Sequence, residues 1–405
     1  MACDPRNAKD QEIQQRDRAF GSVIGAFIGD AAGAYLEFRR GGSLASKTDE
    51  VKHAIAMNGG GYWNIGKGQV TDDSELAMCL LHGLARGETD RDIKVVQVLS
   101  TLNRQNSPLN LDKIQQMFGK WFYSNPFDVG ETSLLAFSVI KLDKPNPQVS
   151  FQNSLENTSK SLSNGCLMRI TPLAVWGYRL SNEELYEAVK LQTHFTHSHK
   201  VAIDACYLYC FAIKQLIITG NPEIAFKATT QEAKHHKIDP TLSQWLFLIE
   251  IGEVENFPQP SQDPQGFLKI AFVWAFYYLK VGMPYQDAIY DILQRGGDTD
   301  TNAAILGGLL GARDGLSKLP TFMVDSVLSF RCDTPDMIAQ YKVTHKRPDF
   351  LIPGFHLTSL LNEVFQKAPE KLIVQINGEY IIGLHRIREI IRPRMQDANR
   401  PSGKV

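Results

Sequence analysis

RAFGSVIGAFIGDAAGAYLEF, residues 18–38, is largely apolar and carries a glycine at every fourth position. These glycines are Gly21, Gly25, Gly29 and Gly33. A four-residue period places them on one helix face, although each glycine costs a helix interior roughly 1 kcal/mol relative to alanine. We therefore predict a helix over Arg18–Phe38 whose glycine face packs closely on another helix. The small-residue stretch TNAAILGGLLGAR, Thr301–Arg313, is a candidate partner.

Helical periodicity extends over most of the chain up to about residue 330. The further predicted helices are Asp73–Arg86, Thr89–Asn103, Leu111–Tyr123, Thr132–Lys141, Asn182–Thr193, Lys200–Thr219, Pro222–His235, Thr241–Gly252, Asp263–Val281 and Tyr285–Gln294. No alternating strand pattern interrupts them, so we expect a compact all-α, multi-helix body. Near the C-terminus, Leu372–Gly383 consists of two short apolar runs joined by Asn377-Gly378, which predicts a β-hairpin.

These patterns divide the chain into four predicted segments. We expect a flexible N-terminus over residues 1–17 and a helical domain over residues 18–330. A small C-terminal appendage, residues 331–395, would contain the hairpin and pack on the helical body. Residues 396–405 would form a flexible tail.

Composition excludes several classes of partner. The 405 residues contain 43 Lys and Arg against 44 Asp and Glu, a net charge of −1, and no basic run that could follow a phosphate backbone. The longest apolar run, Ile270–Leu279, is too short to span a bilayer. The N-terminus has no hydrophobic signal segment, and the six cysteines have no disulfide-framework spacing. We expect a cytoplasmic, monomeric protein that binds neither nucleic acid nor membrane.

Two motifs suggest ligand sites that their context does not favour. His197 and His199 precede Cys206 and Cys210, which could indicate zinc, but two thiols inside an apolar helix are more typical of a core. The stretch GYWNIGKG, residues 61–68, is close to a phosphate-binding P-loop. It has glycine where the magnesium-binding Ser or Thr would stand, and no buried strand precedes it. We interpret it as a glycine-rich loop that leads into the next helix.

Acidic residues gather at two helix starts, QVTDDSE at residues 69–75 and GGDTDTN at residues 296–302. Helix capping is the simplest explanation, since an acid at a helix start accepts first-turn N–H bonds. A cap uses one acid, however, and each stretch supplies more. If the two clusters met, together with Glu37 at the end of the glycine-rich segment, the carboxylates would repel one another. Mg²⁺ or Mn²⁺ would relieve that repulsion, with the Thr71 and Thr301 hydroxyls as neutral oxygen ligands. The residues alone leave the chemistry of such a site open.

Six segments in order resemble motifs of the ADP-ribosylglycohydrolase family. They are GAFIGDAAGAYLEF (Gly25–Phe38), GQVTDDSELAM (Gly68–Met78), WFYSNPFDVGET (Trp121–Thr132), SNGCLMRITPLA (Ser163–Ala174), FTHSHKVAIDAC (Phe195–Cys206) and RGGDTDTNAAILGGLLGA (Arg295–Ala312). The family's fold is all-α, which agrees with the periodicity.

The resemblance implies a centre of two Mg²⁺ or Mn²⁺ ions and a cleft for ADP-ribose. The implied metal ligands are Thr71, Asp72, Asp73, Asp298, Asp300 and Thr301. The implied substrate-binding residues are Gly130, Thr132, Asn164, Gly165, His197 and Gly297. Glu37 or a metal-bound aspartate such as Asp300 would act as the catalytic acid or base.

The activity that the resemblance implies is hydrolysis of the N- or O-glycosidic bond between ADP-ribose and a modified protein side chain. Arginine is the favoured attachment and serine the next. Two alternatives remain open at this point: a non-catalytic member that binds ADP-ribose or serves structurally, and a metal-dependent phosphatase. The intact acidic clusters weigh against the first, and the other motifs weigh against the second.

Overall fold

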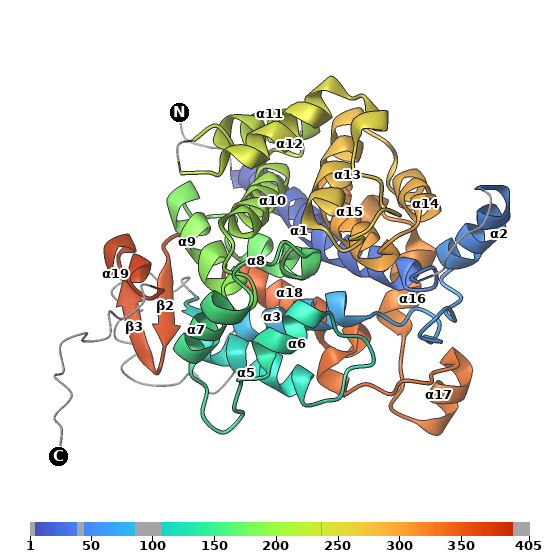
Figure 1. Cartoon of the computed structure of the whole chain (residues 1–405), viewed down its shortest axis with the longest axis horizontal. Helices are drawn as coiled ribbons and strands as arrows, with labels where there is room; N and C mark the ends of the chain where they lie inside the picture. The colour runs from blue at the N-terminus through green and yellow to red at the C-terminus, as the bar shows by residue number, and fades with distance from the viewer. Residues whose placement is uncertain (1–4, 39–43, 86–106, 236, 392–405) are drawn as a thin grey trace, which may run out of the picture.

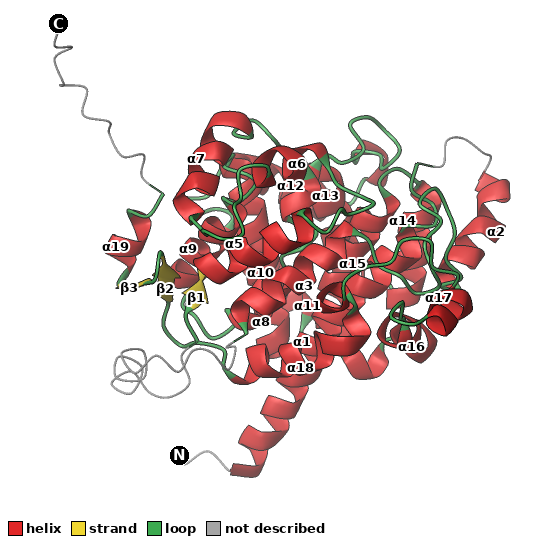
Figure 2. Cartoon of the chain, turned by 90° about the horizontal axis from the view of Figure 1, so that it is seen from below, coloured by secondary structure: helices red, strands yellow, loops and turns green. Residues whose placement is uncertain are grey.

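The structure is a computed structural model that describes residues 5–38, 44–85, 107–235 and 237–391. The helices are α1 (Pro5–Gly33), α2 (Leu44–Ile55), α3 (Asp72–Leu84), α5 (Leu111–Phe122), α6 (Glu131–Phe137), α7 (Pro147–Asn157), α8 (Thr171–Trp176), α9 (Asn182–Thr193), α10 (Lys200–Thr219), α11 (Pro222–Glu232), α12 (Pro240–Ile251), α13 (Leu268–Val281), α14 (Tyr285–Arg295), α15 (Thr299–Asp314), α16 (Thr321–Ser329), α17 (Pro335–Tyr341), α18 (Pro353–Gln366) and α19 (Leu384–Arg388). Short 3₁₀ turns span Asn164–Cys166, Val254–Asn256, Leu316–Lys318 and Asp349–Leu351. The strands are β1 (Leu109–Asn110), β2 (Ile373–Ile376) and β3 (Glu379–Ile382). The predicted all-α class is confirmed, and the small sheet lies at one edge of the molecule (Figure 2).

Helices α1 and α15 pack closely in the middle of the body, as the glycine spacing predicted (Figure 1). A Cβ atom on Gly29 would lie 2.0 Å from the carbonyl oxygen of Ala303 on α15. One on Gly21 would lie 2.3 Å from the carbonyl oxygen of Gly311, and one on Gly33 would lie 2.4 Å from Cα of Asp300. The pairing is antiparallel, because the contacts on α15 move toward its start as those on α1 move toward its end. The C-terminal end of α1 therefore meets the N-terminal end of α15.

Helix α10 lies in the core of the body. Within the described part of the chain it is the one helix that is long and apolar enough to cross a membrane by length and composition. Most of that apolar stretch, 89% of its residues, is buried in the body. Its hydrophobic character is therefore explained by packing against neighbouring helices such as α8, α9, α11 and α15.

Helix α18, in the segment after residue 330, is built into the helical body, whereas β2, β3 and α19 lie at the edge of the molecule (Figure 2). Leu357, Leu361 and Phe365 of α18 are buried in the same hydrophobic cluster as α1 and α3. The predicted hairpin is confirmed: β2 and β3 pair antiparallel, and Asn377 and Gly378 adopt φ of 50° and 75° in the turn. Strand β1 pairs parallel with β2, so a segment before α5 completes the sheet.

Several elements differ from the sequence predictions. Helix α1 begins at Pro5 and ends at Gly33, so described residues of the expected flexible N-terminus are helical and Glu37 lies in the turn that follows. Helices α2, α7, α8, α16, α17, α18 and α19 were not predicted. The predicted helix Thr89–Asn103 and the predicted tail, residues 396–405, lie outside the described residues.

Candidate functional site

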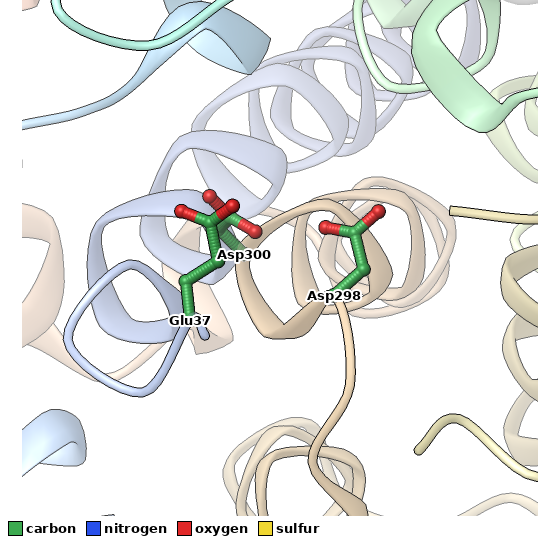
Figure 3. Close-up of side chains that lie close together, drawn as sticks. All are labelled: Glu37, Asp298 and Asp300. Carbon is green, nitrogen blue, oxygen red and sulfur yellow. The ribbon is translucent and has the colours of Figure 1, made fainter. Parts of the chain in front are cut away.

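The packing of α1 against α15 brings three carboxylates together. Glu37 lies in the turn after α1, Asp298 immediately precedes α15, and Asp300 lies in its first turn. Each offers a carboxylate oxygen, and these oxygens all lie within 4.8 Å of one another (Figure 3). Asp298 occupies the N-cap position of α15 but its side chain makes no capping hydrogen bond. Asp300 accepts a hydrogen bond from the backbone N–H of Thr301 at 2.9 Å, so capping accounts for one acid of this cluster and not for Asp298 or Glu37.

Helix α3 brings the second acidic cluster to the same place, through a buried aspartate of α1. Asp30 is fully buried and accepts hydrogen bonds from the backbone N–H of Thr71 at 3.0 Å and of Ser74 at 3.0 Å. It also accepts a bond from the Thr71 hydroxyl at 2.8 Å. Because Asp30 satisfies N–H groups at the start of α3, the carboxylates of Asp72 and Asp73 remain available for other contacts.

The two clusters meet at Asp73. Its Oδ2 atom lies 3.4 Å from the hydroxyl of Thr71 and 3.4 Å from the hydroxyl of Thr301 on α15. Its Oδ1 atom is buried without a hydrogen-bond partner among the described residues. A buried carboxylate oxygen that lacks a donor is costly unless a cation occupies the space beside it.

Burial and mutual repulsion make this cluster difficult to ionise. Burial first, and then the carboxylates of Asp128 and Asp298, raise the pKa of Glu37 to about 9. Burial followed by neighbouring carboxylates also raises the pKa of Asp72, of Asp73 and of Asp300 well above the ordinary range. A divalent cation would favour the charged forms again. The donors are carboxylate and hydroxyl oxygens, and together with the unpartnered Asp73 oxygen they fit Mg²⁺ or Mn²⁺.

A pocket of about 340 Å³ opens above the carboxylates. It is lined by predicted site residues from several elements: Glu37, Asp72, Gly130, Thr132, Asn164, Gly165, Gly297, Asp298, Asp300 and Thr301. Asn164 donates from Nδ2 to Oδ2 of Asp298 at 2.7 Å, which fixes that carboxylate at the pocket wall. Thr71 and Asp73 do not line the pocket and lie buried beneath it.

Two predicted site residues have surroundings other than those expected. His197 is fully buried and does not line the pocket; its Nε2 lies 2.8 Å from the hydroxyl of Ser163, and its Nδ1 lies 2.8 Å from the hydroxyl of Thr196. It therefore supports Ser163, which does line the pocket. Gly297 has φ of 80°, and a Cβ there would lie 1.9 Å from the carbonyl oxygen of Pro260. The close approach of the loop at Pro260 therefore requires a glycine at position 297, which also lines the pocket.

Three residues of the site were missed by the sequence analysis. Asp128 lines the pocket, and burial followed by Asp298 raises its pKa to about 7. Trp63 donates from Nε1 to Oε2 of Glu37 at 2.6 Å. Asp30 organises the start of α3. None of the three belongs to a cluster of similar residues in the sequence. Asp30 and Asp128 do lie within segments that resemble the family's motifs, and that position was the one available signal.

The zinc and P-loop alternatives find no support in the described residues. Cys206 and Cys210 are fully buried on α10, and no cysteine belongs to a group of metal-ligand side chains in the described ranges. His199 accepts a bond from the backbone N–H of Val201 and caps α10. The glycine-rich stretch 61–68 forms a loop closed by a bridge between Gly60 and Ile65, and it is followed by α3.

Comparisons with known proteins show what the chain is similar to. The sequence model of the family ADP-ribosylglycohydrolase matches residues 11–349. The ADP-ribosyl-[dinitrogen reductase] glycohydrolase of Rhodospirillum rubrum is 25% identical over 307 residues, which cover 75% of this chain and 88% of that protein. The ADP-ribosylarginine hydrolase Tri1 of Pseudomonas putida (strain GB-1) is 23% identical over 315 residues, which cover 78% of this chain and 75% of that protein.

A solved structure shares the fold. A chain of an ADP-ribosylglycohydrolase-related protein complex superposes with a TM-score of 0.58 at 18% identity, covering 88% of this chain and 99% of its own. The family model covers residues 11–349, which is most of the chain. The chain therefore belongs to the ADP-ribosylglycohydrolase family.

Proposed function

We propose that this protein is a metal-dependent hydrolase that cleaves the glycosidic bond between ADP-ribose and a modified protein side chain, with arginine favoured and serine next. The observation that carries the proposal is the convergence of Glu37, Asp298 and Asp300 with the α3 carboxylates at the floor of one pocket. Two relatives are named as a glycohydrolase of ADP-ribosylated dinitrogen reductase and as a hydrolase of ADP-ribosylarginine. These names support the same reaction class.

The proposed ligands of two Mg²⁺ or Mn²⁺ ions are Thr71, Asp72, Asp73, Asp298, Asp300 and Thr301. When bound, such ions would supply orientation of the ribose hydroxyls and activation of water. In this arrangement Asn164 holds Asp298 through the 2.7 Å hydrogen bond, and Asp30 holds the start of α3. These supports fix carboxylates that would otherwise separate by repulsion.

The chain's own residues would then assist bond cleavage at the anomeric carbon. The transition state of glycoside hydrolysis carries positive charge on the sugar, which nearby carboxylates stabilise. Glu37 is suited to hold a proton because burial raises its pKa. Its Oε2 accepts the Trp63 hydrogen bond, which orients the carboxyl group at the pocket. We propose that Glu37 acts as the acid or base of the reaction. Water adds its hydroxyl group to the anomeric carbon, the bond to the protein side chain breaks, and the side-chain nitrogen or oxygen takes up the proton.

The test is release of ADP-ribose from arginine- and serine-modified peptides, with and without Mg²⁺, by the wild type and Asp300→Ala. Asp325→Ala, at an exposed position on α16, is the matched control. We expect Mg²⁺-dependent release by the wild type and the control, and loss of at least about 100-fold in Asp300→Ala. Absence of release from both peptides would refute the proposal. Tight ADP-ribose binding without turnover would indicate a non-catalytic member, and phosphate release from a phosphomonoester would indicate a phosphatase.

A further inference from the structure

Three aromatic side chains form a contact group beside Glu37, and one of them, Phe38, lines the pocket. Phe38 is 55% exposed, and Tyr62 is 66% exposed. Their ring centroids are 5.1 Å apart, and that of Trp63 lies 4.9 Å from Tyr62 and 6.0 Å from Phe38. We call these three residues the aromatic rim. Large aromatic side chains that are exposed together, rather than singly, are typical of binding surfaces.

The rim is held in place from behind. The ring of Trp63 lies 5.9 Å from that of Phe127, and Phe127 stacks on His345 at 4.6 Å. The Nε2 atom of His345 lies 2.8 Å from the carbonyl oxygen of Trp63. Phe38 adopts φ of 57°, a left-handed conformation that is unfavourable for a bulky residue. The exposed position of Phe38 is thus fixed at an energetic cost, which suggests a role beyond packing.

The rim is joined directly to the carboxylate cluster. Trp63 donates its indole N–H to Glu37, and Phe38 is the next residue in the chain. A further acid, Asp128, lines the same pocket and follows Phe127, whose ring contacts that of Trp63. Aromatic faces next to negative charge attract cations, and a planar guanidinium can stack on such rings. A neutral serine oxygen would gain nothing comparable.

We propose that the aromatic rim binds the guanidinium group of the arginine that carries ADP-ribose, and so selects arginine-linked substrates over serine-linked ones. This inference rests on the proposed function and assigns the side-chain end of the substrate to the Phe38–Tyr62 side of the pocket. The ADP-ribose end would then contact the remaining walls, formed in part by residues 130–133 and 163–165.

The first test is kinetic and compares wild type with Tyr62→Ala, the conservative Tyr62→Phe and the control Phe247→Ala. Phe247, on α12, is an aromatic residue of similar exposure, 61% against 66% for Tyr62, and lies outside the aromatic rim. For an arginine-linked peptide we expect Tyr62→Ala to lower kcat/KM by roughly 5- to 30-fold, mainly through KM. Tyr62→Phe, which keeps the ring, should restore most of it. An effect of Tyr62→Ala no larger than that of Phe247→Ala would overturn the inference, as would cleavage of the serine-linked peptide alone.

The second test does not depend on turnover. Nα-acetyl-arginine amide and its neutral isostere, Nα-acetyl-citrulline amide, are titrated into the protein by calorimetry in the presence of Mg²⁺ and ADP-ribose. We expect the arginine amide to bind more tightly than the citrulline amide, and Tyr62→Ala to remove that preference. Equal binding of the two amides by the wild type would overturn the rim inference and leave the hydrolase proposal intact. If the wild type cleaves neither peptide, the proposed function fails, and this titration decides the rim separately.

Discussion

Replacing Arg347 by methionine should destabilise the protein strongly although Arg347 lies outside the pocket. Its guanidinium forms a bidentate ion pair with Glu75 of α3, with Nε to Oε1 at 2.7 Å and Nη2 to Oε2 at 2.9 Å. The two side chains are only 4% and 2% exposed. Arg347 also donates to the carbonyl oxygens of Ser124 and Asn125 at 3.1 and 3.3 Å. It therefore connects α3 to the loop that leads to Asp128.

The expected loss is about 3–5 kcal/mol in the free energy of unfolding, the usual cost of leaving one member of a buried ion pair unpaired. Glu75 would keep the hydrogen bond from the indole of Trp121 at 2.8 Å. Burial raises the pKa of Glu75 even beside Arg347, so the carboxyl could take up a proton in the variant and limit the loss. We therefore expect a value near the lower end, about 3 kcal/mol.

The assay is urea unfolding followed by tryptophan fluorescence, with two further variants. Arg388→Met breaks the ion pair with Glu187, in which the arginine is 39% exposed, and should cost less than about 1 kcal/mol. The double variant Glu75→Met/Arg347→Met removes both buried charges and should be more stable than Arg347→Met alone. A loss below about 1 kcal/mol in Arg347→Met, or additive losses in the double variant, would refute this reasoning.

Three further predictions concern the centre of the body. Burial and neighbouring carboxylates raise the pKa of Glu37 to about 9, and burial raises the pKa of Asp128 to about 7. The folded, metal-free protein therefore holds protons on these groups that the unfolded chain has already lost, and this stabilisation disappears as the pH rises. The melting temperature in EDTA should therefore fall from about pH 5 to about pH 9, because the Asp128 contribution is lost by about pH 7 and the Glu37 contribution by about pH 9. Mg²⁺ should raise the melting temperature more at the higher pH, and a melting temperature in EDTA that rises over this range would contradict the reasoning. Gly29→Ala would place a Cβ 2.0 Å from a carbonyl oxygen of α15 and should lower the free energy of unfolding in urea by at least about 2 kcal/mol. A Cβ at Gly130 would meet nothing within 4 Å, so Gly130→Ala should lower it by less than about 1 kcal/mol. Asp30→Asn should weaken Mn²⁺ binding by about 10- to 100-fold in calorimetry, because Asp30 orients the start of α3; unchanged affinity would show that the orientation is immaterial.

The sequence was informative where the physical cause is local. Glycines spaced by four residues, as at Gly25 and Gly29, need close helix contact wherever the partner lies, and the pairing of α1 with α15 follows that expectation. The Asn377-Gly378 turn likewise specifies its hairpin within a few residues. The doubled acids at two helix starts were unusual enough to indicate a site before their proximity was known.

The remaining features depend on contacts between distant segments. Arg347 and Glu75 are 272 positions apart, and neither has a neighbour that predicts an ion pair. Asp30 is an isolated acid in the apolar second half of α1, and only its full burial against the start of α3 shows its role. Helix α18 was likewise not predicted, because its apolar face packs in the common core against helices that are distant in sequence. His197 lies behind the pocket because the Ser163 hydroxyl, not the histidine, occupies the wall.

The central claim is that the converging carboxylates hold divalent metal for glycosidic hydrolysis. The most direct measurement is the rate of ADP-ribose release from an arginine-modified peptide by metal-stripped protein titrated with Mg²⁺. We expect no measurable release before Mg²⁺ is added, a saturable increase with Mg²⁺, and no increase in Asp300→Ala. Release at the full rate by the stripped wild-type protein, or an unchanged titration in Asp300→Ala, would contradict the claim.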